Sequence, residues 1–120
     1  MLSVTKMSTF CYAHHLPGYE GKCQNVHGHN ATLEVEFVKV NLRTYKTMVL
    51  DFNTIKLCVQ PIVDQLDHKN MNDIFERPTC ETITEWIIKK IQETTIGEGL
   101  IRVRLYEGPT SYVEWRKSDV

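Results

Sequence analysis

Residues 27–37 read HGHNATLEVEF, and the second half of this stretch decides the fold. From residue 31 onward every second residue is apolar, and the residues between them are Thr or Glu. The apolar set is Ala31, Leu33, Val35 and Phe37. A repeat of two residues is that of a strand with one face buried. The stretch therefore predicts a strand lying against a hydrophobic core.

Further strands are expected on both sides of this one. Residues 3–10, 101–106 and 111–116 have strand-like patterns, and the last two are separated by Gly108-Pro109. A short returning strand is expected at residues 48–52, after a turn at residues 41–46. Residues 11–26 are expected to be irregular, because Pro17, Gly18 and Gly21 interrupt them.

Two helices are expected between these groups of strands. Residues 52–66 carry apolar side chains at steps of three and four, which marks an amphipathic helix, with Asn53 as its N-cap. A second helix is expected after Pro78, capped by Thr79 or Thr82. Runs of strands interrupted by two consecutive helices predict an α+β fold, an antiparallel sheet with two helices on one face. Residues 1–120 are expected to form a single domain.

Bulk composition excludes some classes of function. The chain of 120 residues has a formal net charge of -1, which gives no electrostatic case for nucleic acid or for an anionic membrane. No apolar run approaches the length of a membrane span, and the first residues do not resemble a signal peptide. A cytoplasmic location is expected, and the four cysteines are expected to be free thiols.

Histidines at the start of the alternating strand suggest a metal site. His27 and His29 are two residues apart, so in a strand they point to the same face, about 6–7 Å apart at the backbone. A third imidazole from His14 or His15 would complete three ligands, and catalytic zinc typically has three protein ligands and one open position. The alternative is a solvated polar start to the strand.

Three further residues could transfer protons. Cys23 precedes His27 by four residues, and Lys22 or a bound cation could favour its thiolate. The alternative is an ordinary loop thiol. Asp67 and His68 are adjacent, so that the carboxylate could orient the imidazole. The alternative is a histidine that interacts with the dipole at a helix C-terminus.

Glu107 is the most informative single residue. The repeat of two places it on the apolar face of its strand, where an unpaired carboxylate is costly. A ligand with adjacent N–H donors, such as the amino-pyrimidinone edge of guanine or pterin, would satisfy this carboxylate. The alternative is that the strand ends at Tyr106 and Glu107 turns outward.

Six motifs in order along the chain resemble the signature of one family. They are FCYAH at residues 10–14, KCQNVHGH at 22–29, VLDF at 49–52, LDHKN at 66–70, PTCE at 78–81 and Tyr106-Glu107. The resemblance is to the 6-pyruvoyl-tetrahydropterin synthase family. It implies the tunnelling fold (T-fold), in which subunits assemble into an oligomeric barrel, typically a hexamer made as a dimer of trimers.

The resemblance also implies roles for individual residues. His14, His27 and His29 match the family's zinc ligands, and His15 falls one place beyond the matching histidine. The other matching residues fall into two groups. Cys23, Asp67 and His68 match the catalytic residues, and Glu107, Thr79 and Cys80 match residues that bind the pterin.

The spacing CxxxHGH at residues 23–29 is similar to the 6-carboxy-tetrahydropterin synthases of queuosine biosynthesis. The implied reaction converts 7,8-dihydroneopterin triphosphate into 6-carboxy-5,6,7,8-tetrahydropterin, acetaldehyde and triphosphate. Three alternatives remain: a 6-pyruvoyl-tetrahydropterin synthase, a metal-independent cysteine hydrolase, and a non-catalytic pterin- or purine-binding module with structural zinc.

Overall fold

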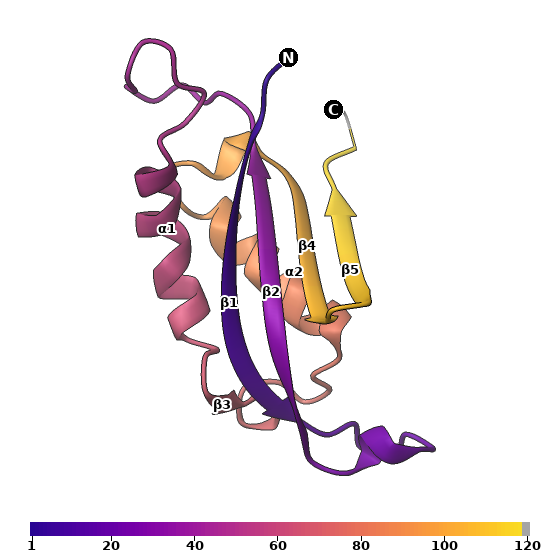
Figure 1. The fold of residues 1–120 in the computed structure, drawn as a ribbon. Helices are drawn as coiled ribbons and strands as arrows, with labels where there is room; N and C mark the ends of the chain where they lie inside the picture. The colour runs from indigo at the N-terminus through magenta and orange to yellow at the C-terminus, as the bar shows by residue number, and fades with distance from the viewer. Residues whose placement is uncertain (119–120) are drawn as a thin grey trace.

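The alternating stretch forms strand β2 (His27–Phe37) at the centre of a five-stranded sheet. The computed structural model describes residues 1–118. β2 pairs antiparallel with β1 (Val4–His14) on one side and with β4 (Leu100–Gly108) on the other. β5 (Ser111–Arg116) pairs antiparallel with β4, and the two-residue β3 (Lys69–Asn70) pairs with the end of β1. The strand order is therefore β3-β1-β2-β4-β5 (Figure 1).

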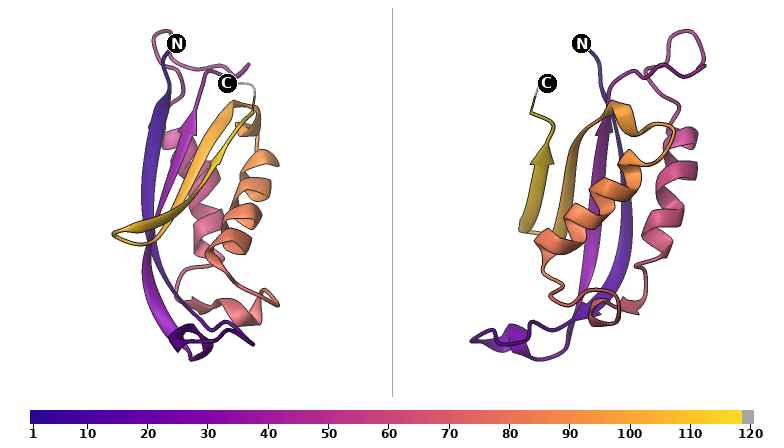
Figure 2. Two further views of the ribbon diagram at one scale, coloured as in Figure 1. Left: turned by 90° about the vertical axis from the view of Figure 1, so that its right-hand side faces the viewer. Right: turned by 180° about the vertical axis from the view of Figure 1, so that it is seen from behind.

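Helices α1 (Phe52–Asp64) and α2 (Cys80–Gln92) lie on the same face of the sheet, as Figure 2 shows. Three short 3-10 turns, at Lys22–Gln24, Met71–Asp73 and Gly97–Gly99, connect the elements. The predicted α+β class and the placement of the helices are confirmed. One detail differs, because the short strand β3 runs parallel to β1. Among residues 1–118, no helix has the length and apolar character needed to cross a membrane.

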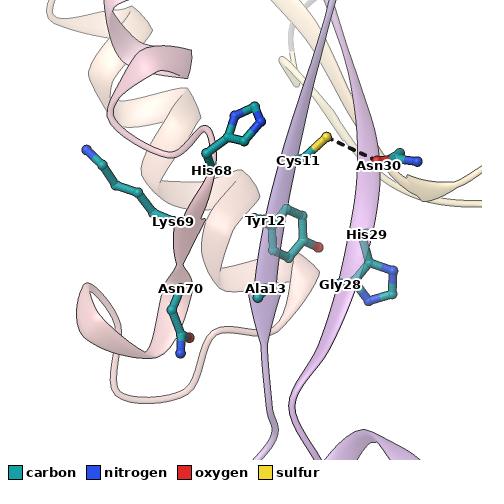
Figure 3. Close-up of a pocket in the computed structure, with 9 residues that line it drawn as sticks. All are labelled: Cys11, Tyr12, Ala13, Gly28, His29, Asn30, His68, Lys69 and Asn70. Atoms are coloured by element: carbon teal, nitrogen blue, oxygen red, sulfur yellow. Dashed lines mark hydrogen bonds between the residues drawn. The ribbon is translucent and has the colours of Figure 1, made fainter.

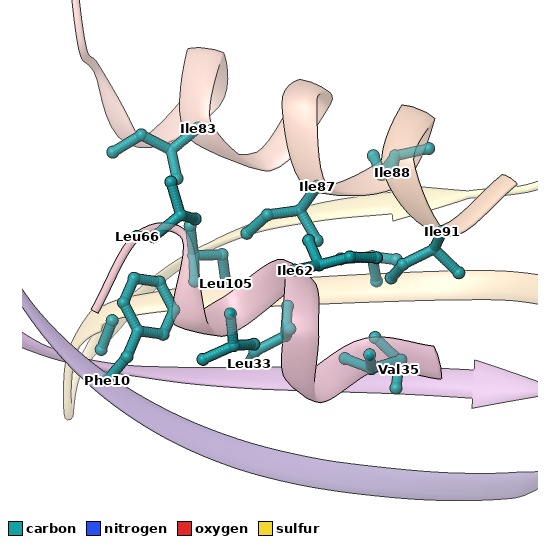
Figure 4. Packing of buried hydrophobic residues seen from close by; sticks show 14 of the residues in the cluster. Phe10, Leu33, Val35, Ile62, Leu66, Ile83, Ile87, Ile88, Ile91 and Leu105 are labelled. Carbon is teal, nitrogen blue, oxygen red and sulfur yellow. The ribbon is translucent and has the colours of Figure 1, made fainter. Parts of the chain in front are cut away.

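The core lies between the sheet and the two helices (Figure 4). β2 contributes its alternating apolar set, of which Leu33 is 1% exposed. α1 and α2 place their apolar stripes over it. These helix residues are Ile55, Val59, Ile62 and Val63 from α1, and Ile83, Ile87, Ile88 and Ile91 from α2. Because both helices cover one face, the other face of the sheet carries the polar residues of the alternation.

The sequence-based boundaries need three corrections. β1 continues to His14 instead of ending at residue 10, because its register with β2 is unbroken from Val4 opposite Phe37 to His14 opposite His27. Residues 48–51 form no strand. Asp51 is the N-cap of α1 in place of Asn53, and its side chain accepts a hydrogen bond from the Asn53 backbone N–H at 2.8 Å.

We expect Leu33→Ala to lower the free energy of unfolding by about 2–5 kcal/mol, because it leaves a cavity in the closed core. Leu57→Ala is the matched control, since Leu57 lies on the outer side of α1 and is 68% exposed. Urea denaturation of both variants at equal chain concentration measures the difference. An equal loss in both variants would contradict this assignment of the core.

Candidate metal and pterin site

The pairing of β1 with β2 brings three histidines together at one end of the sheet. His14 is the direct partner of His27, and His29 pairs with Tyr12 on the same face. The three imidazole rings have centroids 4.5–4.9 Å apart. The Nε2 atoms of His14 and His29 lie 3.0 Å apart. The structure thus places the three histidines named from the sequence in one cluster.

Backbone carbonyls fix which ring nitrogen of two histidines faces the cluster. Nδ1 of His14 lies 2.7 Å from the Pro78 carbonyl oxygen, and Nδ1 of His27 lies 2.7 Å from the Asn25 carbonyl oxygen. A carbonyl can only accept, so each Nδ1 carries the hydrogen and each Nε2 carries a lone pair. Metal-binding histidines typically have such a carbonyl partner on the second nitrogen.

Glu107 joins the histidines from β4. Its Oε1 lies 2.7 Å from Nε2 of His29 and 3.5 Å from Nε2 of His14. The two-residue repeat puts Glu107 on the same face as the buried Leu105. The register shifts at this point, because Tyr106 pairs with Tyr112 and Gly108 pairs with Ser111, so Glu107 is an extra residue in a β-bulge. Bulges redirect side chains at sites of this kind. β4 therefore continues through Glu107, and its side chain points to the helix-covered face.

The cluster fits a divalent metal. The ligand atoms of the three histidines and Glu107 all lie within 4.8 Å of one another. Nε2 of His27 is buried and has no hydrogen-bond partner among residues 1–118, which is costly unless a cation accepts its lone pair. Burial lowers the pKa of His29. The charge of Glu107 raises it and the neighbouring His14 and His27 lower it, and the net shift is downward. The ring therefore favours its neutral form, which can ligate a metal. Imidazole and carboxylate ligands suit zinc.

His15 lies outside the cluster, as its position in the motif predicted. Its backbone N–H donates to Oδ1 of Asn72 at 2.9 Å, and Nδ2 of Asn72 donates to the His15 carbonyl at 3.0 Å. These bonds tie His15 to the turn that follows β3.

Asp67 and His68 form the predicted pair. Nδ1 of His68 lies 2.9 Å from Oδ1 of Asp67, and the same oxygen accepts from the Cys11 backbone N–H at 2.9 Å. The bond from Cys11 and then that from His68 hold the pKa of Asp67 below its ordinary value. His68 has a φ of 60°, and its N–H donates to the Cys11 carbonyl at 2.6 Å. The carboxylate thus keeps the hydrogen on Nδ1 and leaves Nε2 available for proton transfer.

The thiol beside this pair is Cys11. Cys11, Asp67 and His68 have ligand atoms within 4.8 Å of one another. Cys11 and His68 also line a cavity of about 420 Å³ together with His29 (Figure 3). Cys11 was not singled out from the sequence as a functional residue. The available signal was the strand alternation, which puts Cys11 on the face opposite Tyr12 and His14.

Cys23 lies elsewhere in the chain. It is half-buried in the turn Lys22–Gln24, and its carbonyl accepts from the Leu16 N–H at 2.7 Å. The loop that carries it projects past the end of the sheet (Figure 1). Among residues 1–118, neither cluster of metal-ligating side chains includes Cys23. A single chain therefore does not unite Cys23 with Asp67 and His68.

Of the two other residues expected at the pterin, Cys80 lies near Glu107. Both line a cavity of about 120 Å³ between α2 and β5. Burial, followed by the charge of Glu107, raises the pKa of the Cys80 thiol to about 11, so it stays protonated. Thr79 is the N-cap of α2, where its hydroxyl accepts from the Thr82 N–H at 3.2 Å, and it lines a separate cavity beside Arg77.

Comparisons with known proteins show which family the chain belongs to. The chain is 38% identical over 117 residues to a 6-carboxy-5,6,7,8-tetrahydropterin synthase of Synechocystis, covering 92% of this chain and 90% of that protein. It is also 38% identical over 92 residues to a dihydroneopterin monophosphate aldolase of Pyrococcus furiosus, covering 76% and 78%. The structure of 6-pyruvoyl tetrahydropterin synthase from Caenorhabditis elegans superposes with a TM-score of 0.84 at 22% identity, covering 98% and 96% of the two chains. Because its sequence identity is low, this neighbour shows the fold alone. The family model for 6-pyruvoyl tetrahydropterin synthase matches residues 3–118 of the chain. The chain therefore belongs to the 6-pyruvoyl tetrahydropterin synthase family.

Proposed function

We propose that this protein is a 6-carboxy-5,6,7,8-tetrahydropterin synthase acting on 7,8-dihydroneopterin triphosphate, with acetaldehyde and triphosphate as the other products. The observation that carries the proposal is the convergence of three histidine Nε2 atoms beside the Glu107 carboxylate. Relatives with this name cover most of the chain. A role in queuosine biosynthesis and a cytoplasmic location stay predictions.

In this proposal His14, His27 and His29 hold Zn²⁺. When bound, the zinc supplies Lewis-acid stabilisation of negative charge on the substrate's side-chain oxygens. The carbonyl partners of His14 and His27 keep both rings in the ligating tautomer before any metal arrives. Preorganisation of this kind lowers the cost of assembling the site.

Proton transfer falls to Cys23 and His68, with Asp67 positioning His68. Nδ1 of His68 is held by Asp67, so the free Nε2 is the nitrogen that takes up or releases a proton. Glu107 would accept hydrogen bonds from the N–H groups of the pterin ring, and Cys80 would line the same pocket. The Thr79 side chain lines a different cavity, so Thr79 would meet the pterin through its backbone, next to Cys80.

The arrangement favours a homo-oligomer in which one copy supplies Cys23 and another supplies Asp67 and His68. The sheet has an open edge for such contacts. β3 pairs only with Tyr12 and Ala13, and the backbone of Cys11 is bonded to Asp67 and His68, so the outer edge of β1 has no partner from Val4 to Phe10 within the described chain. Unpaired edges of this kind template pairing with another strand. A hexamer built as a dimer of trimers is the assembly we propose.

One experiment tests this function. The zinc-loaded protein is incubated with 7,8-dihydroneopterin triphosphate, and the products are identified by mass spectrometry. We expect a carboxy-tetrahydropterin together with acetaldehyde. A pyruvoyl product without acetaldehyde would assign the other synthase activity. Full turnover after removal of zinc would favour a cysteine hydrolase.

A second candidate function is suggested by the Pyrococcus furiosus relative, which carries the name of a dihydroneopterin monophosphate aldolase. The parallel incubation therefore uses dihydroneopterin monophosphate. Cleavage of that compound, with no turnover of the triphosphate, would make the protein an aldolase. No turnover of either compound by the metal-loaded protein would leave a pterin- or purine-binding module.

A further inference from the structure

Glu107 stands beside the three histidines as a fourth side chain able to ligate a metal. Three protein ligands leave one position for the substrate, whereas four close the site as in structural zinc sites. Oε1 of Glu107 lies 2.7 Å from Nε2 of His29 and 3.5 Å from Nε2 of His14. Its ligand atom belongs to the same group as those of the three histidines. The four side chains together form a complete set for a four-coordinate metal.

The proposed function requires the same carboxylate for a different task. To hold the adjacent N–H groups of a pterin ring, both oxygens of Glu107 must face the ring as acceptors. A carboxylate that turns Oε1 toward the metal cannot at the same time present both oxygens side by side to the ring, so the paired bonds to the two N–H groups are lost. The two uses of Glu107 therefore exclude each other.

We propose that Glu107 closes the metal site in the ligand-free protein, and that binding of the pterin ring draws it away and opens the site. The inference rests on the proposed function, because it uses both the metal and the pterin ring. In this inference the fourth position on the metal opens only when the substrate binds. Other ligands in the cell therefore do not reach the metal before the substrate does.

Three features of the structure permit this exchange. The β-bulge frees Glu107 from direct pairing with β5, so its side chain is not held by the register of the sheet. Its side chain is 30% exposed and borders the cavity that Cys80 also lines, which gives the carboxylate a second place to turn. The Tyr12 hydroxyl is buried without a partner among residues 1–118, although its ring packs against His14 and His29.

The Tyr12 hydroxyl is a donor suited to the displaced carboxylate. A phenol carries its hydrogen near neutral pH, so the hydroxyl acts as a donor. A buried donor without an acceptor is costly, and a carboxylate that moves toward it removes that cost.

The test uses the cobalt(II) form of the full chain, because visible absorption reports what binds to the metal without any turnover. Azide is titrated with and without a saturating pterin that lacks the C6 side chain, whose own binding is measured by fluorescence. We expect the pterin to strengthen azide binding about 5- to 150-fold, the usual range of coupling between two sites. Glu107→Gln is expected to bind azide tightly without pterin and to show no further gain. Glu85→Gln, on the exposed side of α2, is the matched control and should behave as the wild type.

The outcomes separate this inference from the proposed function. Equal azide affinity with and without bound pterin, or equal affinity in the wild type and Glu107→Gln, would show that Glu107 does not close the metal site. The metal site and the pterin site would still stand. Failure to take up cobalt, or to bind pterin at all, would instead contradict the proposed function, and with it the closure of the metal site by Glu107.

Discussion

Replacing His27 with alanine is expected to empty the metal site and to lower turnover by at least about 10³-fold, since several kcal/mol of charge stabilisation are lost. Nε2 of His27 is buried without a partner, and Nδ1 is already bonded to the Asn25 carbonyl, so the free nitrogen has no other function in the described chain. Metal content after gel filtration, measured by mass spectrometry, should fall from one ion per chain to nearly none.

His15→Ala is the matched control for this prediction. His15 follows the ligand His14 directly, but its backbone is tied to Asn72 and its ring lies outside the cluster. We expect this variant to keep its full metal content. If His27→Ala retained stoichiometric metal, or if His15→Ala lost it, the assignment of the three ligands would be wrong.

Two inactive variants, Cys23→Ala and His68→Ala, are expected to regain activity when they are combined in one oligomer. Each variant alone should lose about 10²- to 10⁴-fold in turnover, the usual contribution of a proton-transfer residue. In the single chain Cys23 lies outside the cluster that holds Asp67 and His68, so a working site would need one half from each of two copies. Random pairing of the two variants leaves about a quarter of the sites intact, because each half is intact with a probability of about one half.

The measurement is turnover by oligomers that carry both variants, isolated through two different affinity tags after co-expression. The combination of Asp67→Ala with His68→Ala is the control. Both changes damage the same half of the site, so this pair should stay inactive. Activity no higher than that of the single variants, in oligomers shown to contain both chains, would mean that the site is not divided between copies in this way.

Much of the fold follows from local patterns in the sequence. The alternation in residues 31–37 and the apolar steps of three and four in residues 52–66 and 83–91 reflect which faces are buried, and this is why the layers were predicted. The boundaries were harder. The prediction of a strand at residues 48–52 was wrong, because Asp51 caps α1 there. β1 runs four residues further than expected, because pairing with β2 keeps it extended.

The candidate site was likewise predictable only where a local pattern specifies it. His27 and His29 could be predicted as neighbours because two residues of one strand share a face. The choice of His14 over His15 came from the family motif, and the structure agrees because β1 stays paired to its last residue. Their roles in binding and catalysis stay predictions, as do those of Cys23, Asp67 and His68.

The sequence by itself determined the chain's family, its layers and which residue types could meet a metal, because these depend on short repeats and on motifs within the chain. Only the tertiary structure decided three further points. The Pro78 carbonyl orients the His14 imidazole, the strand order brings Glu107 of β4 against the histidines, and Cys11 lies beside the Asp67–His68 pair. Each depends on backbone positions and on contacts between residues up to 93 positions apart, such as those between His14 and Glu107. No local pattern specifies such contacts, since they are fixed by strand register and by the packing of the helices on the sheet.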